Sequence, residues 1–425
     1  MDRRRFIAHT TAMTCPCIAL AGCTDERNGS TADSTEDDDE EPPDSDEEVN
    51  EEQNDVEHDG EPITDYDLEV HDERSNGHVF WVDHNERMYG GRSNRVLISD
   101  DWWETTETLY TVTEHEDTND YIQSVIVPES GRVVVGVGGR ADKTTGRVIL
   151  LDEDVEDHET VYEFDWGRVS NSLAHVVYED IIVIGSYGQS DFEDGNHPNE
   201  VILSTDGGES FNRILEAELR TEDAPNLHIH DVEYDPHAER IWVAVGDNAN
   251  TQLHWSDDLG DSWEQIGETG EAPMVTQISA FEDCIVLGTD GTPEGIIRWE
   301  RDTPDEEPDG VEEFEHHSTL QFETDNDRMQ TFARRRWHIR EDDGRELCLM
   351  PFGYSPMNPD ATDSVLLAST DGDAWYELYR TETQDILLSN VMGPLSMDGD
   401  LRTLVSDSFQ SGGHQIDATV PEFWE

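Results

Sequence analysis

Histidine, acidic and arginine side chains come together at two places in this sequence, and each spacing suggests a chemistry. His228 and His230 are two residues apart and would share one face of a strand. With Asp231, and with His175 from a neighbouring strand, they could ligate a metal ion. The run at 334–338, Arg-Arg-Arg-Trp-His, could hold a carboxylate or a sugar. Both patterns also fit a structural role, in which the histidines hydrogen-bond neighbouring sheets and the arginines pair with carboxylates. We therefore assign no metal and no other cofactor.

Apolar strands of similar length recur along the chain and would position these residues. In each unit a strand enters, a short polar turn follows, and a second strand ends in glycine. A third strand then precedes a polar segment. Short apolar strands separated by turn residues predict an all-β fold. The paired strands span 124–138, 175–185, 230–246 and 277–288, and third strands lie at 200–203 and 252–255.

The polar segment after the third strand carries a repeated motif, Ser-x-Asp-x-Gly-x-x-Trp/Phe. Copies begin at Ser204 and Ser256, a copy one residue shorter begins at Ser369, and a degenerate copy without the glycine begins at Ser99. Ser204 and Ser256 are 52 residues apart, and the other two gaps, of 105 and 113 residues, are about twice as long. A degenerate copy of the motif is therefore expected within each of the two long gaps. A four-stranded unit that repeats at this period is typical of a propeller blade.

The repeat length predicts a seven-bladed β-propeller of four-stranded antiparallel blades over residues 63–425. A propeller of six blades is the alternative, because one or two of the repeats match the motif poorly. The last unit, at 391–420, supplies three strands, so we expect the segment around 65–70 to supply the fourth. This N-terminal strand would close the ring and leave no free sheet edge.

The repeated motif is that of the Asp-box, and this part of the chain resembles the BNR/Asp-box repeat propellers of the sialidase-like superfamily. The resemblance implies that the aspartate accepts backbone N–H bonds in the turn, that the glycine takes a positive φ, and that the aromatic residue packs into the blade. The structural residues implied in this way are Ser204, Asp206, Gly208, Phe211, Ser256, Asp258, Gly260, Trp263, Ser369, Asp371 and Trp375.

A propeller usually binds its ligand where the inner strands and their connecting loops meet at the axis. Sialidases place three arginines, an acid/base aspartate and a Tyr–Glu pair there, but their Arg-Ile-Pro signature is absent from this sequence. No catalytic residue is therefore assigned, and a binding module is expected rather than an enzyme. The ligand-binding candidates on the axial face are His175, Tyr187, His228, His230, Asp247, Gln277, Asp290, Arg335 and Tyr354.

The chain is strongly acidic, with 101 Asp and Glu against 26 Lys and Arg in 425 residues and a formal net charge of -75. Nucleic acids and anionic lipid surfaces need a basic partner, so neither is an expected ligand. Such a charge would push a compact chain apart in ordinary buffer, whereas at molar salt the Debye length falls to about 3 Å and the repulsion is screened. The composition resembles that of haloarchaeal proteins.

The first residues have the features of an export signal. Three arginines at 3–5 precede Phe6 as in a twin-arginine signal, and the apolar stretch that follows is too short to span a bilayer. The sequence Leu-Ala-Gly-Cys at 20–23 matches a lipobox, in which Cys23 would carry the lipid. We therefore expect a signal at 1–22, an acidic disordered tether at 23–62, and anchoring to the outer face of the cell membrane.

Together these features predict a monomeric binding or scaffolding module of the cell surface, with an unknown glycan or protein as its ligand and the membrane contacted only through the lipid. A sialidase-like glycoside hydrolase or lyase is one alternative. An assembly or maturation factor for a membrane complex is another, by analogy with Asp-box propellers that help to build photosynthetic complexes.

Cys284 and Cys348 lie in apolar strands and are expected as buried packing residues, with a disulfide as the alternative.

Overall fold

The computed structural model describes residues 68–71, 78–112, 120–139, 146–152, 154–164, 168–169, 175–187, 199–217, 228–246, 248–289, 295–316, 332–333, 336–341, 343–353, 364–381, 388–393, 395–397, 401–407 and 413–418. Regular structure in these residues is β-strand, apart from the short 3-10 helices η1 (Asn248–Asn250) and η2 (Val311–Glu313). No helix among them is long and apolar enough to cross a membrane.

The strands of the described residues form seven antiparallel sheets, which we number as blades in chain order. Blade 1 holds β2 (His78–Val82), β3 (Met88–Arg92), β4 (Arg95–Ser99) and β5 (Glu107–Thr111). Blade 2 holds β6 (Asp120–Ile126), β7 (Val134–Gly139), β8 (Arg147–Leu151) and β9 (His158–Glu163). Blade 3 holds β10 (Arg168–Val169), β11 (His175–Tyr178), β12 (Ile181–Tyr187), β13 (Asn199–Ser204) and β14 (Asn212–Ala217).

The remaining blades have the same order of strands. Blade 4 holds β15 (Ile229–Asp235), β16 (Arg240–Val245), β17 (Gln252–Ser256) and β18 (Glu264–Gln265). Blade 5 holds β19 (Val275–Ala280), β20 (Cys284–Thr289), β21 (Ile296–Glu300) and β22 (Glu315–His316). Blade 6 holds β23 (Phe332–Ala333), β24 (Trp337–Arg340), β25 (Glu346–Gly353), β26 (Ser364–Ser369) and β27 (Tyr376–Thr381). Blade 7 holds β28 (Leu388–Met392), β29 (Leu401–Asp407), β30 (Gly413–Ala418) and β1 (Leu68–His71).

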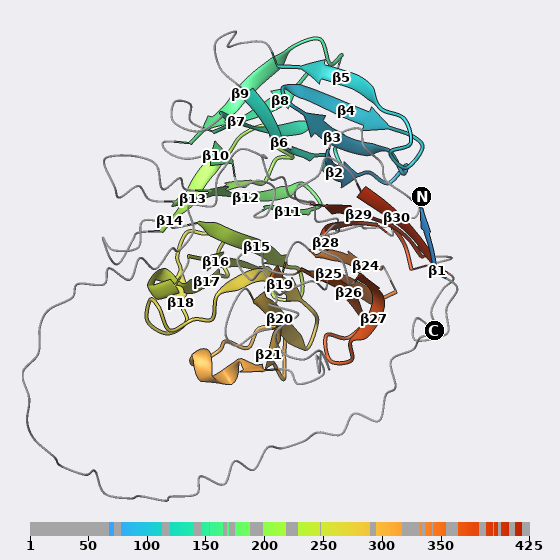
Figure 1. The fold of residues 1–425 in the computed structure, drawn as a ribbon. Helices are drawn as coiled ribbons and strands as arrows, with labels where there is room; N and C mark the ends of the chain where they lie inside the picture. The colour runs from blue at the N-terminus through green and yellow to red at the C-terminus, as the bar shows by residue number, and fades with distance from the viewer. Residues whose placement is uncertain are drawn as a thin grey trace, which may run out of the picture.

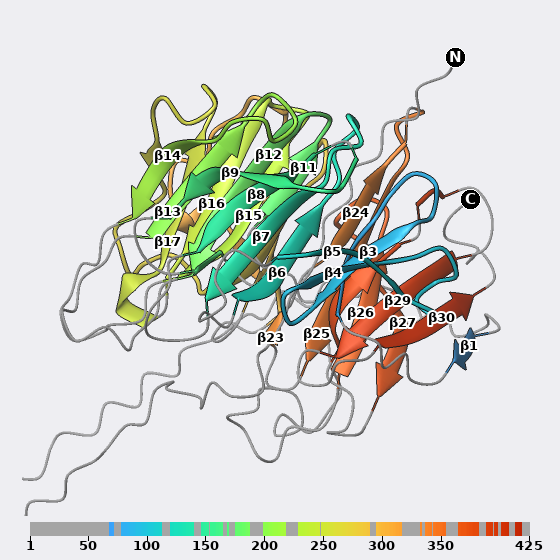
Figure 2. The same cartoon turned by 90° about the horizontal axis from the view of Figure 1, so that it is seen from above.

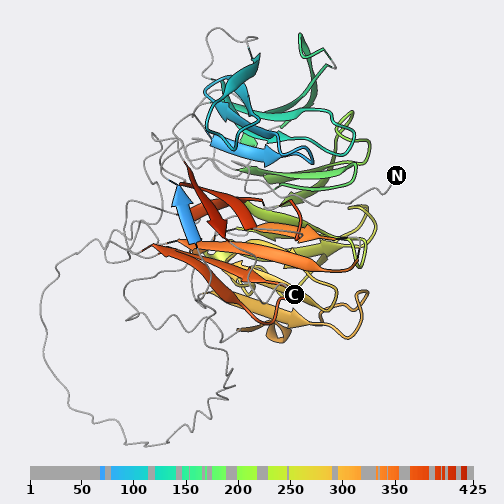
Figure 3. The ribbon, with the colours of Figure 1, turned by 90° about the vertical axis from the view of Figure 1, so that its right-hand side faces the viewer.

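The blades follow one another around a ring (Figure 1). Consecutive blades contact each other through their inner strands, as β15 does with β19, and β28 of blade 7 contacts β2 of blade 1. Figures 2 and 3 show neighbouring sheets stacked face against face. A ring of antiparallel sheets packed in this way is a β-propeller. The all-β propeller predicted from the sequence is confirmed.

The N-terminal strand β1 completes the last blade. It pairs antiparallel with β30, from Leu68 opposite Ala418 to His71 opposite Gln415, so blade 7 has the order β28-β29-β30-β1. The outermost strand of the last blade therefore comes from the other end of the chain (Figure 1). This closing strand is the one expected around residues 65–70, and in the structure it begins at Leu68.

The core lies between the blades, and strand β16 shows how it forms. All six residues of β16 are buried, and successive side chains point to opposite faces of the sheet. Ile241 and Val243 pack with apolar residues of blade 3, whereas Trp242 and Ala244 pack with those of blade 5. A blade is therefore apolar on both faces, which explains the continuous apolar runs in the sequence.

The Ser-x-Asp motifs form the turns between the third and fourth strands. In blade 4, Ser256 Oγ accepts the N–H of Gly260 at 2.8 Å and donates to Asp258 Oδ1 at 2.8 Å. Asp258 also accepts the hydroxyl and the N–H of Ser262, at 2.6 and 2.8 Å. These hydrogen bonds hold the pKa of Asp258 below its ordinary value. The Asp258 carboxylate thus accepts hydrogen bonds from residues of its own turn. The turn at 204–210 has the same four hydrogen bonds.

The turn of blade 1 keeps this geometry without its glycine. Trp103 takes the place that Gly260 has in blade 4, and its N–H donates to Ser99 Oγ at 2.9 Å. Its backbone has φ 67°, which is strained for a residue with a side chain. The indole is 1% exposed, and its burial offsets that strain. The degenerate motif therefore still forms the turn.

The turns also dock on the preceding blade. A Cβ added to Gly260 would lie 2.5 Å from Ile214 Cβ of blade 3, and Trp263 Nε1 donates to Ile214 O at 2.7 Å. Gly208 of blade 3 approaches Val134 of blade 2 in the same way, with 2.4 Å from an added Cβ to Val134 Cγ2. The glycine of the motif is thus needed both for its positive φ and for close contact between blades.

Replacing this glycine should therefore cost more stability than the backbone conformation alone explains. Gly260 and Gly344 have φ of 90° and 87°, so alanine at either position should cost about 1 kcal/mol from strain. Gly344 has open space around an added Cβ, whereas Gly260→Ala also meets Ile214 and should cost about 1–3 kcal/mol more. Urea unfolding in molar KCl measures both losses. Equal losses would contradict the docking of the turn on blade 3.

The closing strand gives a second prediction. Removing residues 1–72 deletes β1 and leaves one side of β30 unpaired, which should lower the melting temperature and favour association through the free edge. Removing residues 1–62 keeps β1 and serves as the matched control. Thermal unfolding and light scattering in molar KCl measure the two effects. If both truncations melted alike, β1 would have no part in closing the ring.

Candidate functional site

Five of the nine axial candidates lie in the described residues and come to one face of the ring. The inner strands begin at this face and the second strands end there, because the two run antiparallel. His175, His230 and Gln277 lie near the starts of inner strands, His228 directly precedes one, and Tyr187 ends the second strand β12. The other four candidates, Asp247, Asp290, Arg335 and Tyr354, lie outside the described residues.

Tyr187 and His228 join blades 3 and 4 at this face. Their backbones form an antiparallel bridge, and their rings stack with centroids 3.8 Å apart and planes 11° from parallel. The ring of His230 follows, with its centroid 6.0 Å from that of His228. Tyr187 and His228 are half-buried, so the Tyr187–His228 stack lies partly open to solvent.

The other three described candidates are buried. His230 is 7% exposed and its Nδ1 lies 2.9 Å from Val275 O of blade 5. Gln277 is fully buried, and its Nε2 donates to Pro351 O of blade 6 at 3.1 Å. His175, at the start of β11, is 1% exposed. These side chains lie within the packed ring, whereas Tyr187 and His228 reach its surface.

A recurring irregularity of the inner strands redirects one of these candidates, His230. In five blades the pairing with the second strand shifts by one residue near the start of the inner strand. In blades 3 and 6 the inner strand is divided into two segments, β10 with β11 and β23 with β24. A β-bulge bends its strand and redirects the extra side chain. The extra residues are Phe80, Gln123, His230, Thr276 and Ser389.

A buried ladder of charges runs along the inner strand of blade 4. Asp231, Glu233 and Asp235 alternate in β15, share one face of the strand, and are at most 1% exposed. Arg336, beside β24 of blade 6, makes ion pairs with both Asp231 and Glu233. Arg340 Nη2 lies 3.2 Å from Glu233 Oε1. The expectation that the arginine run pairs with carboxylates is confirmed for Arg336.

Asp235 completes this charge ladder with an arginine of blade 5. Arg301 Nη1 donates to Asp235 Oδ2 at 2.5 Å, and Arg301 also donates to Phe281 O at 2.5 Å and to Glu282 O at 3.0 Å. A buried carboxylate needs such partners because desolvation of an unpaired charge is costly. The three acids of the ladder, Asp231, Glu233 and Asp235, are thus matched by the three arginines, Arg336, Arg340 and Arg301.

The charge ladder engages Asp231, which the sequence suggested as a metal ligand. Asp231 Oδ2 accepts the N–H of Ile278 at 2.7 Å in addition to its ion pair with Arg336. The carboxylate that the sequence suggested as a ligand beside His228 and His230 therefore holds blades 4, 5 and 6 together. Within the part of the chain that the structure describes, no group of three or more His, Cys, Asp and Glu side chains could hold a metal ion.

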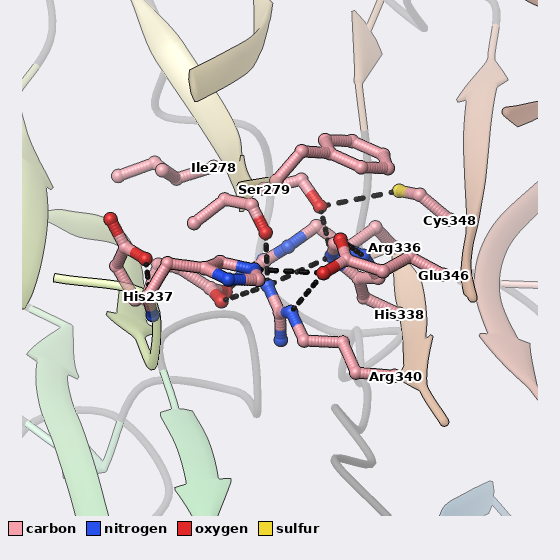
Figure 4. Close-up of polar contacts among 12 residues, drawn as sticks. His237, Ile278, Ser279, Arg336, His338, Arg340, Glu346 and Cys348 are labelled. Atoms are coloured by element: carbon pink, nitrogen blue, oxygen red, sulfur yellow. Dashed lines mark hydrogen bonds and ion pairs between the residues drawn. The ribbon is translucent and has the colours of Figure 1, made fainter. Parts of the chain in front are cut away.

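His338 lies beside the charge ladder in a polar cluster (Figure 4). Its Nδ1 is 2.6 Å from Ser279 Oγ and 3.1 Å from Arg340 Nη2. Because a guanidinium can only donate, Nδ1 is the acceptor and the ring proton is on Nε2, which lies 3.3 Å from Glu346 Oε2. Glu346 Oε1 is in turn 2.8 Å from His237 Nε2 of blade 4. The cluster links blades 4, 5 and 6.

Burial keeps both the imidazole and the nearby thiol of this cluster uncharged. It lowers the pKa of His338 to about 3 and raises that of Cys348, whose Sγ lies 3.3 Å from Ser279 Oγ, to about 12. Cys348 and Cys284 are both free and buried, as predicted from their apolar strands. The chemistry of these groups in the folded protein is packing and hydrogen bonding.

Sequence reasoning missed the charge ladder, although one half of it left a signal. The alternation of Asp231, Glu233 and Asp235 in a predicted inner strand places three acids on one buried face. Such a face requires buried cations. Nothing local in the sequence identifies Arg336 and Arg301 as the partners, because they lie in other blades.

The state of His338 predicts how stability changes with pH. Its pKa is 6.5 in the unfolded chain and about 3 in the fold, so below pH 6.5 the unfolded chain takes up a proton that the folded protein does not. Stability should therefore fall as the pH decreases from 6.5, by about 1.4 kcal/mol per pH unit through this group. His338→Asn should flatten the slope measured by urea unfolding between about pH 6.5 and pH 4.5.

The control for this experiment is His84→Asn, since His84 is exposed on a turn of blade 1. It should keep the slope of the wild type. An unchanged slope in His338→Asn, with the same fold by circular dichroism, would show that the buried imidazole is not the group that titrates.

No protein-family model matches the sequence, and no curated protein matches it. Among solved structures the chain is similar to YCF48 bound to a D1 peptide, with 11% identity and a TM-score of 0.51 over 84% of this chain and 97% of that one. A GH74 xyloglucanase from Xanthomonas campestris is 12% identical with a TM-score of 0.48, over 81% of this chain and 52% of that one. Both are β-propellers, and at such identities the likeness concerns the fold alone.

Proposed function

We propose that this protein is a binding module of the cell surface, which recognises a peptide segment of another protein through the axial face of its propeller. The Tyr187–His228 stack carries this proposal, because it offers an aromatic platform at the mouth of the ring. Flat aromatic surface of this kind is a usual anchor for a peptide or a sugar ring. The similar structure of YCF48 holds a D1 peptide, which supports a peptide as the ligand.

The proposal extends to how the module is held. The twin-arginine pattern at 3–5 and the lipobox ending at Cys23 support export and a lipid anchor, with residues 23–62 as the tether. The net charge of -75 supports a protein that works at high salt. The turn geometry at Ser204 and Ser256 supports a place among the Asp-box propellers.

A binding role also suits the acids of the inner strand β15 better than hydrolysis does. Glycoside hydrolysis needs two carboxyl groups that flank the scissile bond. The described inner-strand acids Asp231, Glu233 and Asp235 are at most 1% exposed and paired with arginines. These carboxylates serve ion pairs within the fold and are buried from a substrate.

The test compares peptide and glycan arrays, together with a turnover screen, in molar KCl. Tyr187→Ala and His228→Ala should each weaken ligand binding about tenfold or more, as expected for removal of an aromatic anchor. Tyr110→Ala is the matched control, because Tyr110 pairs with His158, at 2.6 Å from hydroxyl to Nδ1, on the outer strands β5 and β9. It should bind like the wild type.

Two results would overturn the proposal. One is unchanged ligand affinity in both Tyr187→Ala and His228→Ala, provided that each melts within a few degrees of the wild type. The other is turnover of a glycan that either variant abolishes, which would make the axial face an active site. Binding confined to glycans would replace the peptide as the ligand.

A further inference from the structure

A cleft of about 490 Å³ opens between blades 4 and 5, apart from the Tyr187–His228 stack. One wall is the connection from β18 to β19, and the other is β21 with the segment around η2. This volume lies in the range that holds an organic ligand. The cleft is lined by Thr251, Gly270, Glu271, Ala272, Pro273, Met274, Ile297, Val311, Glu312 and Phe314.

Hydrogen bonds hold the wall that belongs to blade 4. Thr251 Oγ1 donates to Ala272 O at 2.7 Å, and Thr251 O accepts the N–H of Gly270 at 2.8 Å. Glu271 Oε2 accepts the N–H of Glu268 at 2.7 Å, which fixes its carboxylate at the rim. These hydrogen bonds tie the connection to Thr251, just before β17, and to itself.

The opposite wall is fixed in a similar way. Trp299 Nε1 donates to Glu313 Oε2 at 3.2 Å, and the rings of Trp299 and Phe314 lie 5.9 Å apart. Phe314 N–H also donates to Val311 O at 3.2 Å. Since both walls are held by contacts within the protein, little conformational entropy would be lost on binding.

The lining combines apolar side chains with two acidic ones. Most of the ten lining residues are apolar, while Glu271 and Glu312 are exposed carboxylates and none of the ten is Lys, Arg or His. Arg298, next to Ile297 in β21, points to the other face of the strand, where it lies 3.4 Å from Glu300. Because the lining holds two carboxylates and no basic side chain, the cleft has a net negative charge.

We propose that this cleft binds a lysine side chain of a peptide ligand. The aliphatic stem of lysine would lie along Met274, Ile297 and Phe314, and its ammonium group would meet Glu271 and Glu312. Long basic side chains cover apolar surface while their charged ends stay at the rim. Phe314 adds a ring face for the cation, and Met274 can adapt its shape to the stem.

High salt favours this occupant over a bare cation. Molar salt screens the attraction between exposed charges, so carboxylates alone would hold a cation weakly. The apolar contact of the stem is not screened in that way. The volume of the cleft also leaves room for the residues next to the lysine, which is why we take a peptide rather than a free amine. Only this choice of a peptide rests on the proposed function, because the cleft shares no residue with the Tyr187–His228 stack.

The test titrates the full-length protein in molar KCl with two peptides that differ by one ammonium group, acetyl-Ala-Lys-Ala-amide and the same peptide with norleucine. The lysine peptide should bind about threefold more tightly, because the two peptides share the apolar stem and exposed charge contacts add less than about 1 kcal/mol at high salt. Binding should move the methyl resonance of Met274, which is assigned with Met274→Leu. Glu312→Gln and Glu271→Gln should remove the preference for lysine. Glu315→Gln, at an exposed glutamate outside the lining, is the matched control and should keep it.

Two further variants distinguish binding in the cleft from binding at the axis. Val311→Trp fills the cleft without changing its charge and should abolish binding of both peptides. Tyr187→Ala should leave the preference for the lysine peptide intact, even if it weakens binding of a ligand at the axial face. Equal affinity for the two peptides, no binding of either, or tighter binding of spermidine than of the lysine peptide would each overturn the inference. Loss of the lysine preference in Tyr187→Ala would also overturn it, since the peptide would then sit at the axis.

Discussion

Each blade of this ring must bury both of its faces against its neighbours, and the rest of the structure depends on that requirement. Strand β16 is buried along its whole length for this reason, with alternate residues serving blades 3 and 5. The turn glycines serve the same end, because a side chain at Gly260 would hold blade 4 away from Ile214. A stack of sheets with two apolar faces has no stable end, so the chain closes it into a circle and uses β1 to complete the last blade.

The charge ladder shows how a very acidic chain uses its few cations. The protein has 26 Lys and Arg against 101 Asp and Glu, yet Arg336, Arg340 and Arg301 are placed in the interior. An unpaired carboxylate in that environment would be strongly destabilising, whereas a matched pair fixes which strands lie together. Since Arg336 reaches from blade 6 to β15 of blade 4, the ladder holds three consecutive blades in one arrangement. At high salt such buried pairs are screened far less than charges at the surface.

The inner strands combine two tasks near the axial face. Their bulges and breaks interrupt the regular pairing at the level where a ligand would approach, and they turn side chains such as His230 towards the next blade. Further along β15 the same strand returns to regular pairing and carries the buried acids. The rigid part of each blade thus supports an irregular end, where Tyr187 and His228 can be presented. Binding sites are commonly built in this way, on short irregular segments that a rigid sheet positions.

The sequence by itself determined the blades, because local features specify them: the alternation of apolar residues, the Ser-x-Asp turns and the repeat of 52 residues are all readable along the chain. It also indicated the closing strand, since the last unit lacked a fourth strand of its own. Only the tertiary structure decided which polar residues are buried and which are exposed. His175, His230 and Gln277 look like Tyr187 and His228 in the sequence, yet the first three are buried. The physical reason is that the partners of His230 and Gln277, which are Val275 and Pro351, come from other blades, and ring closure alone brings them within contact.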